Sequence, residues 1–156
     1  MLRLDWISGT RTTSDPSRRS VAPEVILIVG GLLLNFAWEL LQTPLYADAG
    51  KPWRYLLRTR AHCTGGDVLI LLAAHAVTAL AARDRRWARH QSRAPILIFV
   101  LTGLAYTGLS EWFNARVTLS WAYADLMPTF FGIGAAPLLQ WLVIPAILVA
   151  LLRRCS

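Results

Sequence analysis

Residues 23–46 read PEVILIVGGLLLNFAWELLQTPLY, and this stretch decides the fold. The run from Val25 to Leu34 is apolar, Pro23 suits the first turn of a helix, and Pro44 ends it. A helix needs about 20 residues to cross the hydrocarbon core of a bilayer, which is about 30 Å thick. The segment therefore predicts a transmembrane helix over 23–46.

The same segment has a second interpretation, as a secretory signal peptide. A basic leader precedes the apolar run, and Ala47-Asp48-Ala49 resembles a cleavage site. However, polar Asn35, Glu39 and Gln42 separate the apolar run from that site. The uncleaved span is therefore the preferred interpretation.

Three further segments have the length and composition of membrane spans. They cover about 67–82, 94–114 and 131–152. Because backbone polar groups in lipid must be hydrogen-bonded internally, and the apolar pattern is helical, these segments predict helices. We expect an all-α integral membrane four-helix bundle, with residues 23–156 as a single transmembrane domain.

The segments between the spans have distinct compositions. Residues 1–22 are polar and contain several arginines, which predicts a disordered or surface-lying leader. The first loop, 47–65, carries aromatic and basic residues typical of a short interfacial helix. Gly65 and Gly66 then open the second span, with Asp67 near its N-terminus. The third loop, 115–130, holds Trp121, Tyr123 and Met127-Pro128, which suit a structured segment at the membrane surface.

The distribution of arginine predicts the orientation. The leader, the loop 83–93 and the tail Arg153-Arg154 are rich in arginine, whereas the third loop has one base. Basic loops face the cytoplasm, so both ends are expected to be cytoplasmic in a bacterial inner membrane. The basic first loop, on the outer side in this topology, departs from the rule.

Composition excludes some functions. The chain has 156 residues, of which 55% are hydrophobic, and a net charge of +7. The basic residues lie between apolar runs and no nucleic-acid motif is present, so nucleic acid is not an expected partner. Cys63 and Cys155 have no metal-ligand spacing and fall on opposite sides of the membrane, which argues against a disulfide between them.

Polar residues form stripes on the predicted helices. Asn35, Glu39 and Gln42 are spaced i, i+4, i+7, and Thr107, Glu111 and Asn114 repeat that spacing. Asp67 and His75 are eight residues apart on the second span, and Gln140 would enter from the fourth. Charged residues within membrane spans are costly and usually face the bundle interior. The stripes therefore predict a hydrated pocket near the outer leaflet.

Each polar group also has a purely structural interpretation. The carboxylates can bond neighbouring side chains, pair with nearby arginines, or sit in headgroup water. His75 can serve as a hydrogen bond between helices as well as a proton carrier or ligand. No local motif predicts a metal site, and the cofactor content stays open.

The candidate roles follow from residue chemistry. Glu39 and Glu111 are the acid/base candidates, because carboxyl groups in a partly dehydrated site can exchange protons near neutral pH, and Asp67 and His75 are further catalytic candidates. The candidates for binding a ligand are polar, aromatic and basic residues: Asn35, Trp38, Gln42, Arg54, Arg58, Asn114, Trp121, Tyr123 and Gln140. Arg54, Arg58 and Arg60 would hold an anionic headgroup.

Several of these segments also carry a resemblance. Residues 35–39 (NFAWE), 44–46 (PLY), 111–114 (EWFN), 121–123 (WAY) and 137–141 (PLLQW) look like parts of small bacterial multi-pass membrane proteins of unassigned function. This resemblance covers most of 35–145 and implies no activity. The spacing of acids and aromatic residues is also similar to membrane carotenoid cyclases and hydratases, although those chains are longer and their paired acidic motif is absent here.

Three functions are compatible with these features. The preferred hypothesis is a membrane protein that binds membrane lipid or a small lipophilic or amphipathic ligand, with acid/base catalysis on it as an extension. The second is a small proton-coupled transporter that works as a homodimer, because Glu39 beside Trp38 in the first helix resembles the small multidrug transporters. The third is a non-catalytic subunit of a membrane complex.

Overall fold

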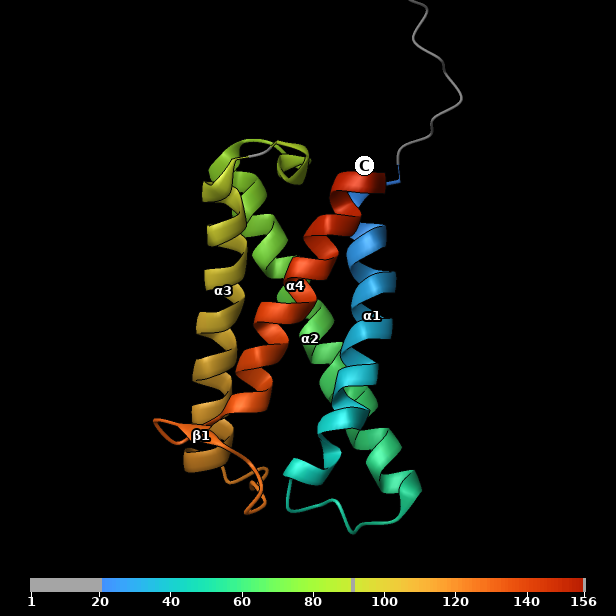
Figure 1. Cartoon of the computed structure of the whole chain (residues 1–156), viewed down its shortest axis with the longest axis vertical. Coiled ribbons are helices and arrows are strands. Elements are labelled where there is room, and N and C mark those ends of the chain that lie inside the picture. Colours follow the sequence, from blue (N-terminus) through green and yellow to red (C-terminus); the bar gives the residue numbers. More distant parts are fainter. Residues whose placement is uncertain (1–20, 91, 156) are drawn as a thin grey trace, which may run out of the picture.

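Four long helices form the body of the protein (Figure 1). The computed structural model describes residues 21–90 and 92–155. Its long helices are α1 (Pro23–Gln42), α2 (Trp53–Ala82), α3 (Arg93–Trp112) and α4 (Ala135–Cys155). All four are long and apolar enough to cross a membrane, counting the short helical turns that continue α1 and α3. The prediction of an all-α four-helix bundle is confirmed.

Both ends of the described chain lie at one end of the bundle (Figure 1). Four crossings return the chain to the side on which it began, so the connection that contains η2 (Trp87–Arg89) shares that end. We call it the terminal end. The loop after α1 and the third loop lie at the opposite end, which we call the loop end. The predicted leader, 1–22, lies almost wholly outside the described residues.

The second helix differs from the prediction. We expected a separate interfacial helix in the first loop and a span that begins at Asp67, but residues 53–82 form one continuous helix of 30 residues. Gly65 and Gly66 disfavour helix by about 1 kcal/mol each, which is too little to break a helix whose backbone has no other partners in lipid. Asp67 therefore lies in the middle of α2, not at its N-terminus.

The length of α2 also accounts for the basic residues of the first loop. At 1.5 Å per residue, 30 residues span roughly 45 Å, which exceeds a hydrocarbon core of about 30 Å. Arg54 and Arg58 are exposed on its first turns. They therefore lie where α2 extends towards the headgroups, at a depth where charge is tolerated.

The third loop is structured and joined to the loop after α1. Tyr46 and Tyr123 form an antiparallel bridge, and backbone hydrogen bonds flank it, from Ala47 to Ala122 and from Ala124 to Leu45, both at 2.9 Å. The short helices at this end are η1 (Thr43–Leu45) and the π-helical η3 (Phe113–Val117). A hairpin of β1 (Thr129–Phe130) and β2 (Ile133–Gly134) then leads into α4. The fourth helix consequently begins at 135 instead of the predicted 131.

The apolar core occupies the terminal half of the bundle. Its fully buried members include Leu27 of α1, Phe99 of α3 and Leu148 of α4, together with Trp87 from the connection. Close packing is extreme at Gly103, where an added Cβ would overlap the ring of Trp141. Such packing leaves the polar residues to gather in the other half.

Candidate functional site

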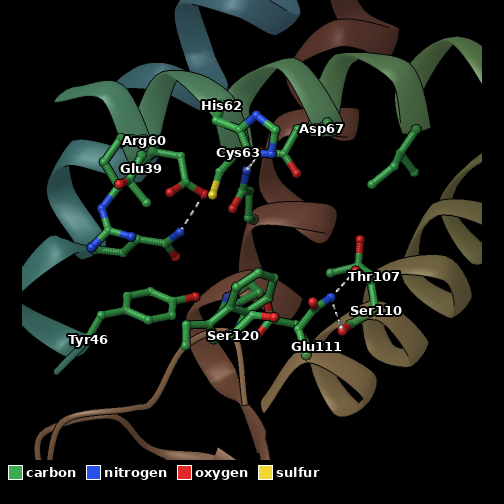
Figure 2. Close-up of a pocket in the computed structure, with 18 of the residues that line it drawn as sticks. Glu39, Tyr46, Arg60, His62, Cys63, Asp67, Thr107, Ser110, Glu111 and Ser120 are labelled. Carbon is green, nitrogen blue, oxygen red and sulfur yellow. Dashed lines mark hydrogen bonds between the residues drawn. The ribbon is translucent and has the colours of Figure 1, made fainter. Parts of the chain in front are cut away.

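A cavity of about 830 Å³ opens in the loop half of the bundle. Acidic side chains from three helices border it, namely Glu39 of α1, Asp67 of α2 and Glu111 of α3. Figure 2 shows Glu39 and Asp67 on one side of the open space and Glu111 on the other. The structure thus brings together the three carboxylates that the stripes predicted to be near one another.

Glu39 is held by its own helix. The side chain is 5% exposed, and one of its oxygens, Oε1, accepts a 2.7 Å hydrogen bond from Nε2 of Gln42. The side-chain oxygen Oε1 of Gln42 accepts a 3.2 Å bond from the indole N–H of Trp38. Trp38 does not border the cavity; it orients the amide that bonds Glu39.

Glu111 is held by the third loop. Its Oε2 accepts a 2.6 Å bond from the hydroxyl of Tyr123 and a 3.4 Å bond from the indole N–H of Trp121. Burial raises the pKa of Tyr123, and the hydrogen bond to Glu111 raises it further, so this phenol stays a donor. The third loop therefore folds over the end of α3 and carries the donors that Glu111 needs.

Gln140 links three helices beneath the cavity. Its Nε2 donates to Oδ1 of Asn35 at 2.7 Å and to Oδ2 of Asp67 at 2.8 Å. Asn35 in turn donates to the carbonyl oxygen of Gly31 at 2.8 Å. Gln140 and Asn35 are each 3% exposed, so this network is internal and positions Asp67.

Arg60, one of the three arginines expected to hold an anionic headgroup, is buried and borders the cavity. It pairs with Asp48, donates to the hydroxyl of Thr43 at 3.2 Å, and its guanidinium lies 5.0 Å from the centre of the Tyr46 ring. Its position could have been found from the i, i+4 repeat of buried Leu56, Arg60, Thr64 and Val68 along α2. The repeat was missed because 47–65 was assigned to a separate loop.

The predicted binding residues divide into three groups. Gln42, Asn114, Trp121 and Gln140 border the cavity. Asn35, Trp38 and Tyr123 do not border it but bond residues that do. Arg54 and Arg58 are exposed and do not border it, because they project from the other side of the first turns of α2. The prediction that these two arginines approach a ligand beside Glu39 therefore has no support in their placement.

His75 does not lie with the three carboxylates that border the cavity. Eight residues correspond to roughly 12 Å along a helix, and this rise carries His75 away from Asp67 into the terminal half. There its Nδ1 accepts a 3.1 Å bond from the indole N–H of Trp87, and its Nε2 lies 3.6 Å from Glu24. The prediction of one stripe that includes both Asp67 and His75 is corrected by this position.

The three carboxylates share one property that bears on chemistry. Among residues 21–90 and 92–155, only one oxygen of each accepts a hydrogen bond: Glu39 Oε1, Asp67 Oδ2 and Glu111 Oε2. The second oxygens are not among the fully buried unpaired atoms of the described chain, so they remain accessible. Each carboxylate therefore retains an acceptor for a bound molecule.

Neither a metal centre nor a related protein indicates the chemistry. No group of three His, Cys, Asp or Glu side chains within the described residues is arranged to hold a metal ion. Comparison of the chain with protein-family models, curated proteins and solved structures finds no significant match.

Proposed function

We propose that this chain is a multi-pass inner-membrane protein whose cavity binds a lipid-like or amphipathic ligand. The observation that carries the proposal is the convergence of Glu39, Asp67 and Glu111, from three helices, on one cavity of about 830 Å³. This volume lies in the range of small-molecule sites, which is about 300–1,000 Å³. Ionisable side chains in membrane spans are rare and usually functional.

The depth of the site follows from the proposed orientation. The terminal end carries Arg83, Arg85, Arg86, Arg89, Arg93, Arg153 and Arg154. The positive-inside rule places that end in the cytoplasm. The cavity then lies towards the outer leaflet, where a lipid ligand has its head near water and its chain in the core.

Acid/base catalysis is an extension of this proposal. Glu39 and Glu111 each have one oxygen fixed by a donor and the other free, which is the arrangement of a carboxyl group that accepts or supplies a proton at a defined atom. The packed core of the terminal half separates the cavity from the opposite membrane face in this conformation. That separation favours binding or catalysis over transport.

The test of ligand binding is purification of the full chain in native lipid particles followed by mass spectrometry of retained small molecules. We expect a retained amphiphile in the wild type and its loss in the double variant Glu39→Gln, Glu111→Gln. The matched control is Glu24→Gln, which removes a carboxylate of the same helix at the terminal end, outside the cavity lining. Retention of no amphiphile, with a larger membrane protein co-purifying instead, would contradict the proposal in favour of an accessory subunit.

The orientation has its own test. Cys155 is exposed at the terminal end, and Lys51 is exposed at the loop end. In whole cells, a membrane-impermeant thiol reagent is expected to label a Lys51→Cys variant and to reach Cys155 only after permeabilisation. Labelling of Cys155 in intact cells would reverse the assignment.

A further inference from the structure

The cavity continues sideways between two helices. Beyond the carboxylates its lining is largely apolar: Leu69, Ile70 and Ala73 of α2 face Thr102 and Tyr106 of α3. Leu69 and Tyr106 are also 68% and 57% exposed on the outer surface of the bundle. Residues that both line a cavity and face outward mark its mouth, and in a membrane-spanning bundle this mouth opens towards lipid chains.

At the polar end of the same cavity, one oxygen of each carboxylate accepts no hydrogen bond from the described residues. The side-chain amides of Gln42 and Gln140 are already bonded to Glu39 and Asp67, and Tyr123 is bonded to Glu111. The free carboxylate oxygens therefore lack donors from the protein. A buried polar atom without a partner in such a site is a place for a ligand atom.

Thr107 is an independent observation that points to a ligand. It borders the cavity, is 7% exposed, and its hydroxyl has no hydrogen-bond partner among the described residues. Figure 2 shows Thr107 and Ser110 on α3 across the open space from Asp67 on α2. A hydroxyl can both donate and accept, so it suits a head group that offers a donor and a lone pair.

The charges disfavour an anionic head group. Arg60, the buried base of the cavity, is paired with Asp48, and Lys51 and His62 lie on the exposed rim. A phosphate or carboxylate placed among Glu39, Asp67 and Glu111 would set its own acceptor oxygens against the unbonded oxygens of these side chains. Of the three arginines expected to hold such a head, Arg54 and Arg58 do not border the cavity, and Arg60 is paired with Asp48.

We infer that the ligand is a lipid with a hydrogen-bond-donating, non-anionic head, a hydroxyl or an amine, and that it enters sideways from the bilayer between α2 and α3. This inference rests on the proposed function and specifies its ligand. The head bonds the free carboxylate oxygens, while the chain lies between Leu69 and Tyr106.

The head-group chemistry is tested with probes of one chain length. The full chain in lipid nanodiscs is incubated separately with hexadecanol, hexadecylamine, hexadecanoic acid and hexadecyl phosphate, and retention is measured by native mass spectrometry. We expect the alcohol or the amine to be retained at least about tenfold better than either anion, since one hydrogen bond to a charged group changes affinity by that order. The comparison of alcohol with amine distinguishes the two donors.

The lateral entrance is tested with two matched alanines of α2. Ala73 and Ala76 are both exposed on that helix, but only Ala73 borders the cavity. Ala73→Phe is expected to fill the mouth and reduce retention of the preferred probe about tenfold or more, whereas Ala76→Phe leaves retention unchanged. Thermal unfolding of both variants shows that neither effect comes from loss of the fold.

The outcomes separate this inference from the proposed function. Preferential retention of hexadecanoic acid or hexadecyl phosphate overturns the head-group assignment and leaves an amphiphile site in place. Equal retention in Ala73→Phe and Ala76→Phe overturns the lateral entrance alone. Retention of none of the four probes, with no native amphiphile found, overturns both the inference and the proposed function.

Discussion

Gln140→Leu offers a direct measure of whether the polar residues of three helices meet as the structure has them. The substitution keeps a side chain of similar size and removes the amide that donates to both Asn35 and Asp67. Gln140 is 3% exposed, so water cannot readily replace these bonds. The variant therefore isolates the connection of α4 to α1 and α2.

The magnitude follows from the two bonds. Hydrogen bonds between helices in membrane proteins contribute about 0.6 kcal/mol on average and at most about 1.7 kcal/mol. Loss of two such bonds is therefore expected to lower the free energy of unfolding by about 1–3 kcal/mol. The bond to Asp67 is expected to supply the larger part, because its acceptor is a carboxylate.

The assay is reversible unfolding in mixed micelles with a rising fraction of denaturing detergent, followed by circular dichroism. A double-mutant cycle of Gln140→Leu with Asn35→Leu is expected to show a coupling of about 0.5–1.5 kcal/mol, because the two residues share one bond. Thr78→Val is the control partner: Thr78 bonds only the carbonyl oxygen of Ala74 in its own helix. Gln140→Leu and Thr78→Val are expected to have additive effects on the free energy of unfolding. If Gln140→Leu and Asn35→Leu are additive within the same error, the result refutes the proposed network.

Three further variants test the packing and the third loop. Gly103→Ala is expected to destabilise the bundle by about 1–3 kcal/mol, because the added methyl overlaps the ring of Trp141. The control is Gly108→Ala, whose added methyl has nothing within 4 Å; it is expected to leave stability unchanged or raise it by up to about 1 kcal/mol. Equal melting temperatures for these two variants would contradict the packing at Gly103. Burial raises the pKa of Tyr123, so its bond to Glu111 stabilises the fold fully below the ordinary phenol pKa of 10.0 and is lost as the pH rises through the higher folded pKa. Tyr123→Phe is therefore expected to remove phenolate absorbance from the late part of an alkaline titration. If the absorbance is lost from the early part instead, the result contradicts the bond.

The spans could be predicted because the local composition of a segment decides whether it inserts into a membrane. A long apolar run must become a helix in lipid whatever it later packs against, so α1, α3 and α4 could be placed to within a few residues. The start of α2 could not, because Gly65-Gly66 and the basic residues before it also suit a turn and a surface helix. Where a helix begins depends on the neighbours that cover its extension. For α2 these include Thr43, Tyr46 and Asp48, which Arg60 contacts.

The site was predictable in part for the same reason. The i, i+4, i+7 stripes fix which residues share a face, and they correctly placed Glu39 and Glu111 towards one interior. They do not fix how far along the bundle axis a residue lies, or which residue pairs with a buried charge. Asp67 and His75 were therefore grouped although the rise of the helix separates them. The burial of Arg60 was not predicted, because its partner, Asp48, lies in a loop.

His75 and Glu39 show that burial of an ionisable group does not by itself make a site. Both side chains are about 95% buried, and both have one polar atom bonded to a neighbour. The second ring nitrogen of His75 is fully buried in the packed terminal half, 3.6 Å from Glu24, and His75 does not border the cavity. The second oxygen of Glu39 stays accessible at a cavity of about 830 Å³ that two other carboxylates border. What distinguishes the loop half is that unused hydrogen-bonding groups lie beside empty space. An unpaired buried polar group and an empty cavity each lower stability, and this combination is the basis of the proposed function.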